Sequence, residues 1–243
     1  MSFGQNYHHN VFWLRLALAD TINKKTKLEL FLQKRTQGIS SDQSNMFRSS
    51  LYNSIWFWVT FTLSKSSKVS VSPIGYFENY TLNAKPLDEN KPPVKEYRFS
   101  VRYTNEQKGR IVNYSNRYSI EYRLRDLEYN GIFRPNFRTR YMAKLEKPVY
   151  GLLTKNKPVT FELHDELFIQ FGRAVHNNPN VFDQNRLYVG FNYEIFKNFE
   201  LDLGYIYVFQ ERKSGEEFDN VNMVWLVLTF DNLFSQFAGK GKH

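Results

Sequence analysis

The chain has 243 residues, 17% of them aromatic, with no cysteine and a formal net charge of +9. This length suits one large all-β domain or two small ones, and apolar runs such as Ile55–Val59 are far too short for a transmembrane helix. The lack of cysteine excludes a disulfide scaffold and thiolate metal sites.

Segments in which apolar and polar residues alternate recur along almost the whole chain, which predicts β-strands with two chemically different faces. In chain order, these segments are Phe12–Leu18, Leu28–Leu32, Leu51–Leu63, Val69–Val71, Tyr97–Tyr103, Tyr118–Leu124, Phe137–Leu145, Val159–Ile169, Leu187–Ile195, Phe199–Phe209 and Val224–Phe230. Pro73 interrupts the fourth segment, so a bulge is expected there. No domain boundary is visible. The expectation is a single domain over residues 1–243, with an N-terminal extension (1–11) and a C-terminal tail (231–243).

The connections between these segments alternate in length. Short lysine-rich connections (NKKTK, SKSSK, NEQKG, TKNKP and KN) alternate with longer ones at residues 37–47, 79–94, 127–135, 173–184 and 211–220. Bacterial outer-membrane barrels have short periplasmic turns and longer extracellular loops, and their single chains have an even number of strands. The sequence therefore predicts one antiparallel transmembrane β-barrel of about twelve strands, with ten as the alternative, although only eleven segments are visible.

The two faces of the predicted strands differ in chemistry. In the hairpin at residues 185–210, the residues predicted to face lipid are Leu187, Val189, Phe191, Tyr193, Leu201, Leu203 and Tyr205. The charged residues predicted to face the lumen are Arg98, Arg102, Arg117, Glu121, Arg123, Arg138, Arg140, Glu162, Glu166, Arg186 and Glu194. Arginine forks that bridge carboxylates suit a confined polar interior. The alternative is a soluble, lipocalin-like ligand-binding barrel, whose apolar face would lie inside.

The stretch FDQNRLYVGFNYEIFKNFELDLGYIYVFQ (182–210) resembles an outer-membrane β-barrel family of Bacteroidota that is catalogued as domain of unknown function 2490. The pieces KEYRFSVRYT, NRYSIEYRLR, HDELFIQFG and LADTINKKTKLELFLQKRTQ are similar to the same family, so the resemblance covers most of the chain. It implies a single small barrel in the bacterial outer membrane, with no assigned activity. MSFGQNYHHN has neither the basic start nor the apolar core of a signal peptide, so the expectation is that such a peptide has been removed.

One group of residues suggests an enzyme. The sequence ELHDEL places Glu162, His164 and Glu166 on one side of a strand, and a histidine beside a carboxylate can act as a general base. An outer-membrane hydrolase is therefore one alternative, but a lumen histidine bonded to its neighbours explains the pattern equally well. No G-x-S-x-G, P-loop or HExxH motif is present, and we expect no catalytic residue, metal site or cofactor.

The net positive charge raises the question of nucleic acid. A single-strand binding surface combines basic side chains with aromatic rings on which bases stack. Here the lysines gather in turns and the aromatic residues face away from the arginines, so no nucleic-acid partner is expected. The sequence favours a non-enzymatic barrel: either a structural or partner-binding element of an envelope assembly, or a narrow pore for small or anionic solutes. Its expected partners are outer-membrane lipid and other envelope proteins.

Overall fold

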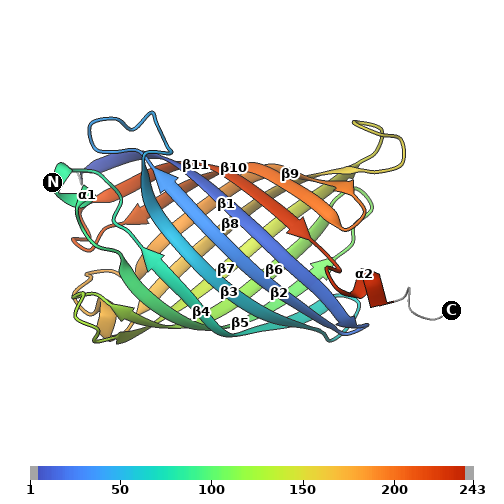
Figure 1. Cartoon of the computed structure of the whole chain (residues 1–243), viewed down its shortest axis with the longest axis horizontal. Helices are drawn as coiled ribbons and strands as arrows, with labels where there is room; N and C mark the ends of the chain where they lie inside the picture. Colours follow the sequence, from blue (N-terminus) through green and yellow to red (C-terminus); the bar gives the residue numbers. More distant parts are fainter. Residues whose placement is uncertain (1–4, 239–243) are drawn as a thin grey trace.

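The computed structural model describes residues 5–238, which form a closed β-barrel of eleven strands (Figure 1). The strands are β1 (Asn6–Asn23), β2 (Thr26–Gln37), β3 (Ser49–Thr62), β4 (Ser67–Asn79), β5 (Val94–Gln107), β6 (Asn113–Asp126), β7 (Arg134–Val149), β8 (Val159–Phe171), β9 (Phe182–Phe196), β10 (Phe199–Glu211) and β11 (Phe218–Phe230). Two short helices, α1 (Pro86–Glu89) and α2 (Ser235–Ala238), lie outside the wall. No helix among the described residues is long and apolar enough to cross a membrane.

The seam between β1 and β11 explains the strand number. All other neighbouring strands are antiparallel, but β1 and β11 pair in parallel, from Asn6 with Phe218 to Leu18 with Phe230. In an odd series of alternating strands the first and the last point the same way, so only a parallel seam closes the barrel. The expectation of twelve strands, or ten, is therefore wrong for residues 5–238, because it assumed an antiparallel seam. Residues 6–11 belong to β1 and not to an N-terminal extension.

Four of the five connections at one end of the barrel are shorter than every connection at the other end, close to the sorting that the sequence predicts. The loop end carries residues 38–48, 80–93, 127–133, 172–181 and 212–217. The turn end carries residues 24–25, 63–66, 108–112, 150–158 and 197–198. β1 begins at the loop end, where α1 also lies, and α2 packs at the turn end (Figure 1). The connection at 150–158 is longer than the other turns.

The bulge predicted at Pro73 is present. The pairing of β4 shifts between Ser72 and Gly75 against β5, and the pairing of β3 with β4 shifts between Trp56 and Val59. Proline has no N–H to give to the ladder, so the strand skips the pairing there. On β3, opposite this bulge, Trp56 and Trp58 lie two residues apart on the inward face and are 5% and 1% exposed.

The alternation separates the two faces of the wall. Leu187, Val189, Leu203 and Tyr205 lie on the outer surface with 37–54% exposure, and Phe191, Tyr193 and Leu201 on the same face are half-buried. Around the barrel, the inner surface of the wall has two sides of different chemistry. The wall from β5 to β9 supplies most of the charged side chains, and the wall formed by β10, β11, β1 and β3 supplies buried aliphatic residues and tryptophans.

Candidate functional site

A network of buried ion pairs lines the interior between β5 and β9, and Glu96 is its least exposed carboxylate, at 0%. Its Oε1 accepts hydrogen bonds from Nε and Nη2 of Arg98, at 2.8 and 2.6 Å, and from Nε of Arg123 at 2.8 Å. Its Oε2 accepts a bond from Nη2 of Arg123 at 2.7 Å. Strands β5 and β6 are neighbours in register, so two forks from adjacent strands converge on one carboxylate.

Two further glutamates extend this network toward the middle of the barrel. Glu121 accepts bonds from Arg138 Nε at 2.7 Å and Arg140 Nη1 at 2.8 Å. Glu166 accepts bonds from Arg140 Nη2 at 2.7 Å and Arg117 Nη2 at 2.8 Å. Arg140 thus bridges the two glutamates. The structure therefore brings together seven of the eleven residues predicted for the lumen network: Arg98, Arg117, Glu121, Arg123, Arg138, Arg140 and Glu166.

The other four predicted lumen residues lie apart from this network. Glu162 faces the interior but pairs with Lys144, at 2.9 Å. Arg102 and Arg186 also face the interior, and within the described residues neither has a carboxylate oxygen within 4.0 Å. Glu194 lies at the rim of the turn end, where 41% of its side chain is exposed and Lys157 pairs with it at 3.3 Å.

A cavity of about 570 Å³ occupies the half of the barrel that faces the loop end. Among the described residues, eleven basic and five acidic side chains line it. Glu96, Glu121 and Glu166 do not line the cavity, because they lie in the wall behind the arginines that they bind. The surface that a solute meets is therefore strongly cationic, and a confined positive surface concentrates anions.

Three of the lining arginines have no carboxylate partner. Arg15, Arg35 and Arg186 belong to β1, β2 and β9, and their guanidinium carbons lie 5.3, 3.4 and 5.6 Å from the centre of the Trp13 ring. Arg35 is also 4.3 Å from the centre of the Tyr52 ring. The aromatic rings attract these cations, but rings do not neutralise charge. Arg15 and Arg35 were not among the predicted lumen residues. Their positions on the polar faces of alternating strands could have identified both as inward-facing.

Large buried side chains lie inside the barrel on the turn-end side of the cavity. Trp58 and Tyr188 are each 1% exposed, and Trp225 is 8% exposed. The Tyr188 ring lies against Gly190 and Gly204, which are cross-strand partners, and a Cβ at either position would overlap with it. The hydroxyl of Tyr188 donates a hydrogen bond to an oxygen of Asp202 on β10 (2.5 Å).

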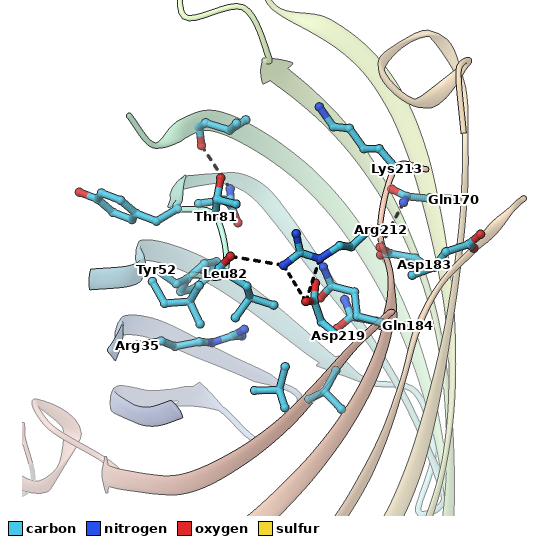
Figure 2. Close-up of a pocket in the computed structure, with 18 of the residues that line it drawn as sticks. Arg35, Tyr52, Thr81, Leu82, Gln170, Asp183, Gln184, Arg212, Lys213 and Asp219 are labelled. Carbon is cyan, nitrogen blue, oxygen red and sulfur yellow. Dashed lines mark hydrogen bonds and ion pairs between the residues drawn. The ribbon is translucent and has the colours of Figure 1, made fainter. Parts of the chain in front are cut away.

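Arg212 lies at the loop end of the cavity and is bonded to two other parts of the chain (Figure 2). Its Nε and Nη2 donate to Asp219 Oδ1 at 2.9 and 2.8 Å. Nη2 also donates to the backbone oxygen of Leu82 in the 80–93 loop, at 3.4 Å. The same loop holds Asp88, which pairs with Lys91 at 2.6 Å. Burial by itself raises the pKa of Asp88, but the hydrogen bond from Lys91 and the charge of Arg212 hold it below its ordinary value.

The three residues of the hydrolase alternative, Glu162, His164 and Glu166, each have other neighbours in the structure. His164 stacks on Tyr188, with ring centres 4.4 Å apart and planes at 13°, and its Nδ1 is buried without a hydrogen-bond partner. No hydrogen bond joins it to Glu162 or Glu166, because Lys144 and two arginines occupy those carboxylates. Within residues 5–238, no group of three histidine or acidic side chains is placed to hold a metal ion.

Two solved structures are similar to this chain. The chain is similar to the β domain of the Bordetella autotransporter BrkA, with 8% identity, a TM-score of 0.47 and coverage of 77% of this chain and 78% of that one. It is also similar to the NanC porin, with 11% identity, a TM-score of 0.45 and coverage of 90% and 98%. No curated protein matches the chain. The family described as protein of unknown function DUF2490 matches residues 10–219, and the chain therefore belongs to the DUF2490 family.

Proposed function

We propose that the protein is a non-enzymatic barrel of the bacterial outer membrane that admits small anions from its loop end into a narrow, arginine-lined lumen. The observation that carries this proposal is the cavity, whose lining has eleven basic side chains against five acidic ones. A lining of this kind raises the local concentration of anions and repels cations. The family itself has no assigned activity.

The outer face supports the membrane part of the proposal. Every strand has at least twelve residues, and a tilted strand needs about 9–11 to span the hydrocarbon core. The outward residues are largely apolar and exposed, among them Phe99, Ile120, Leu163 and Val189 at 45–54%. Such a band is what lipid contact requires. By the same pattern the turn end faces the periplasm and the loop end faces the outside.

The large side chains on the turn-end side of the cavity favour a second candidate. Trp58, Tyr188 and Trp225 lie between the cavity and the periplasmic end, together with the Lys144–Glu162 pair. A barrel closed in this way would be a structural or partner-binding element of an envelope assembly. The two candidates differ in one measurable property, because only the pore conducts ions.

Single-channel recording in planar lipid bilayers tests the proposal. In a potassium chloride gradient, the wild-type protein is expected to conduct with a reversal potential shifted toward that of chloride. Arg186→Gln removes a cation from the cavity lining and should reduce both the conductance and the anion preference. Lys65→Gln, in the exposed turn at residues 63–66, removes the same charge outside the lumen and should change neither. Folded, inserted protein that carries no current above the lipid baseline would overturn the pore and favour the closed barrel.

A further inference from the structure

The three arginines around Trp13 are an unusual group within this barrel. Arg15, Arg35 and Arg186 all have their guanidinium carbon within 5.6 Å of one ring centre. Any two of these guanidinium carbons are therefore separated by no more than twice 5.6 Å. Three like charges at such range repel one another in a confined space, so their gathering needs a compensating partner.

The protein supplies only neutral acceptors to these groups. Arg15 donates from Nε and Nη2 to Oε1 of Gln33, at 3.2 and 3.0 Å. Arg186 donates from Nε to Oε1 of Gln184 at 3.1 Å. Arg35 has a buried Nε with no hydrogen-bond partner. Within the described residues, no carboxylate oxygen lies within 4.0 Å of any of the three guanidinium groups.

The carboxylates of the neighbouring network cannot serve as the missing partners. Glu96, Glu121 and Glu166 each accept bonds from two arginines already and are 0–3% exposed. They lie in the wall, behind the cavity surface. All three unpaired arginines line the cavity itself, so an anion that enters the cavity from solution can reach them.

We propose that Arg15, Arg35 and Arg186 form a binding site for a small multivalent oxyanion, such as phosphate or a compact dicarboxylate. Guanidinium forks match the oxygen pairs of carboxylate and phosphate, and a ligand with two or three negative charges balances three cations. The cavity is large enough for such a ligand with its water. The proposal rests on the proposed function, since it names the class of anion that the cavity admits and holds.

Arg102 provides a matched control for this site. Like Arg35, it has a buried Nε without a partner and stacks on a tryptophan, with its guanidinium carbon 4.1 Å from the Trp58 ring centre. It does not line the cavity. Removing its charge therefore changes the net charge of the interior by the same amount without touching the proposed site.

Isothermal titration of the detergent-solubilised protein with inorganic phosphate, and separately with succinate, tests the site at constant ionic strength. The wild type should bind at least one of the two probes saturably, with one ion per barrel. Arg35→Gln and Arg186→Gln should each weaken that binding by at least about tenfold, as expected for a lost charged hydrogen bond. Arg102→Gln should change it less than about twofold, because it leaves those bonds intact.

Other outcomes overturn the site. Absence of saturable binding of both probes to the folded wild type does so, as does an equal loss in Arg102→Gln and Arg35→Gln. If Arg35→Gln fails to fold, Arg35→Lys keeps the charge but loses the fork, and it should still bind the probe more weakly than the wild type. Conductance separates the two proposals: saturable binding without current removes the pore and keeps the site, and chloride current without binding of either probe does the reverse.

Discussion

Glu96→Gln is the most direct test of the ion-pair network. The carboxylate accepts four hydrogen bonds from two guanidinium groups, at 2.6–2.8 Å, and is 0% exposed. The amide keeps one acceptor oxygen but presents an NH₂ donor to the guanidinium that Oε2 now binds. Arg98 keeps a neutral acceptor at the Oε1 position, and the nearest carboxylate left to it is Glu121, at 3.6 Å. Leaving buried charges without a partner in this way costs about 3–5 kcal/mol.

The free energy of unfolding in urea, measured on protein refolded into lipid vesicles, gives this magnitude. The four tryptophans, Trp13, Trp56, Trp58 and Trp225, all lie inside the barrel and are 1–8% exposed, so their fluorescence reports on loss of the interior. Glu106→Gln is the control, because its pair with Lys68 at 2.8 Å is about 40% exposed on both sides. An exposed pair contributes at most about 1 kcal/mol.

The difference in unfolding free energy between Glu96→Gln and Glu106→Gln tests whether the interior carboxylates hold the arginines. If Glu96→Gln is no more destabilising than Glu106→Gln, the interior carboxylates are not the groups that hold the arginines, and the network argument fails. A double variant, Glu96→Gln with Arg123→Gln, should recover part of the loss, since it removes one of the two unpaired cations. Failure of that recovery would point to lost packing and not to unpaired charge.

Three further predictions concern the wall and the loops. Leu203→Arg, on the outer face, should cost about 2–4 kcal/mol if it lies near the bilayer centre and should reduce insertion into vesicles; normal folding without detergent or lipid would refute the membrane assignment. A cysteine at His176, in the 172–181 loop, should react with an impermeant thiol reagent on whole cells, whereas one at Lys25 should not, and the opposite labelling would reverse the orientation. Asp88 has a pKa below its ordinary 3.8, so the charged form stabilises the 80–93 loop above that pH and this contribution is lost as the pH falls below it. The protection of the loop amides against hydrogen exchange, relative to the unfolded chain at the same pH, should therefore fall only below about pH 4. In Asp88→Asn this protection should already be reduced at neutral pH.

The local pattern of the sequence determined the faces of the wall and the sorting of its connections. Side chains of a strand alternate with a period of two, so the orientation of Leu187, Tyr188 and Val189 follows from their order alone. The bulge at Pro73 follows from the chemistry of one residue. The same parity placed Arg98, Glu121 and Arg140 inside, because a strand face needs no knowledge of its neighbours.

The closure of the barrel, the pairing of charges and the cavity were decided only by the tertiary structure. Eleven alternating segments are visible in the sequence, but only the structure shows that β1 and β11, about two hundred residues apart, pair directly and close the sheet. Whether an arginine pairs with a carboxylate depends on the register between strands. Glu96 on β5 accepts a hydrogen bond from Arg123 on β6, whereas Arg35 on β2 lies opposite Trp13 on β1. Parity fixes the side of the wall on which a charge lies, and the closed sheet fixes which other charges it meets.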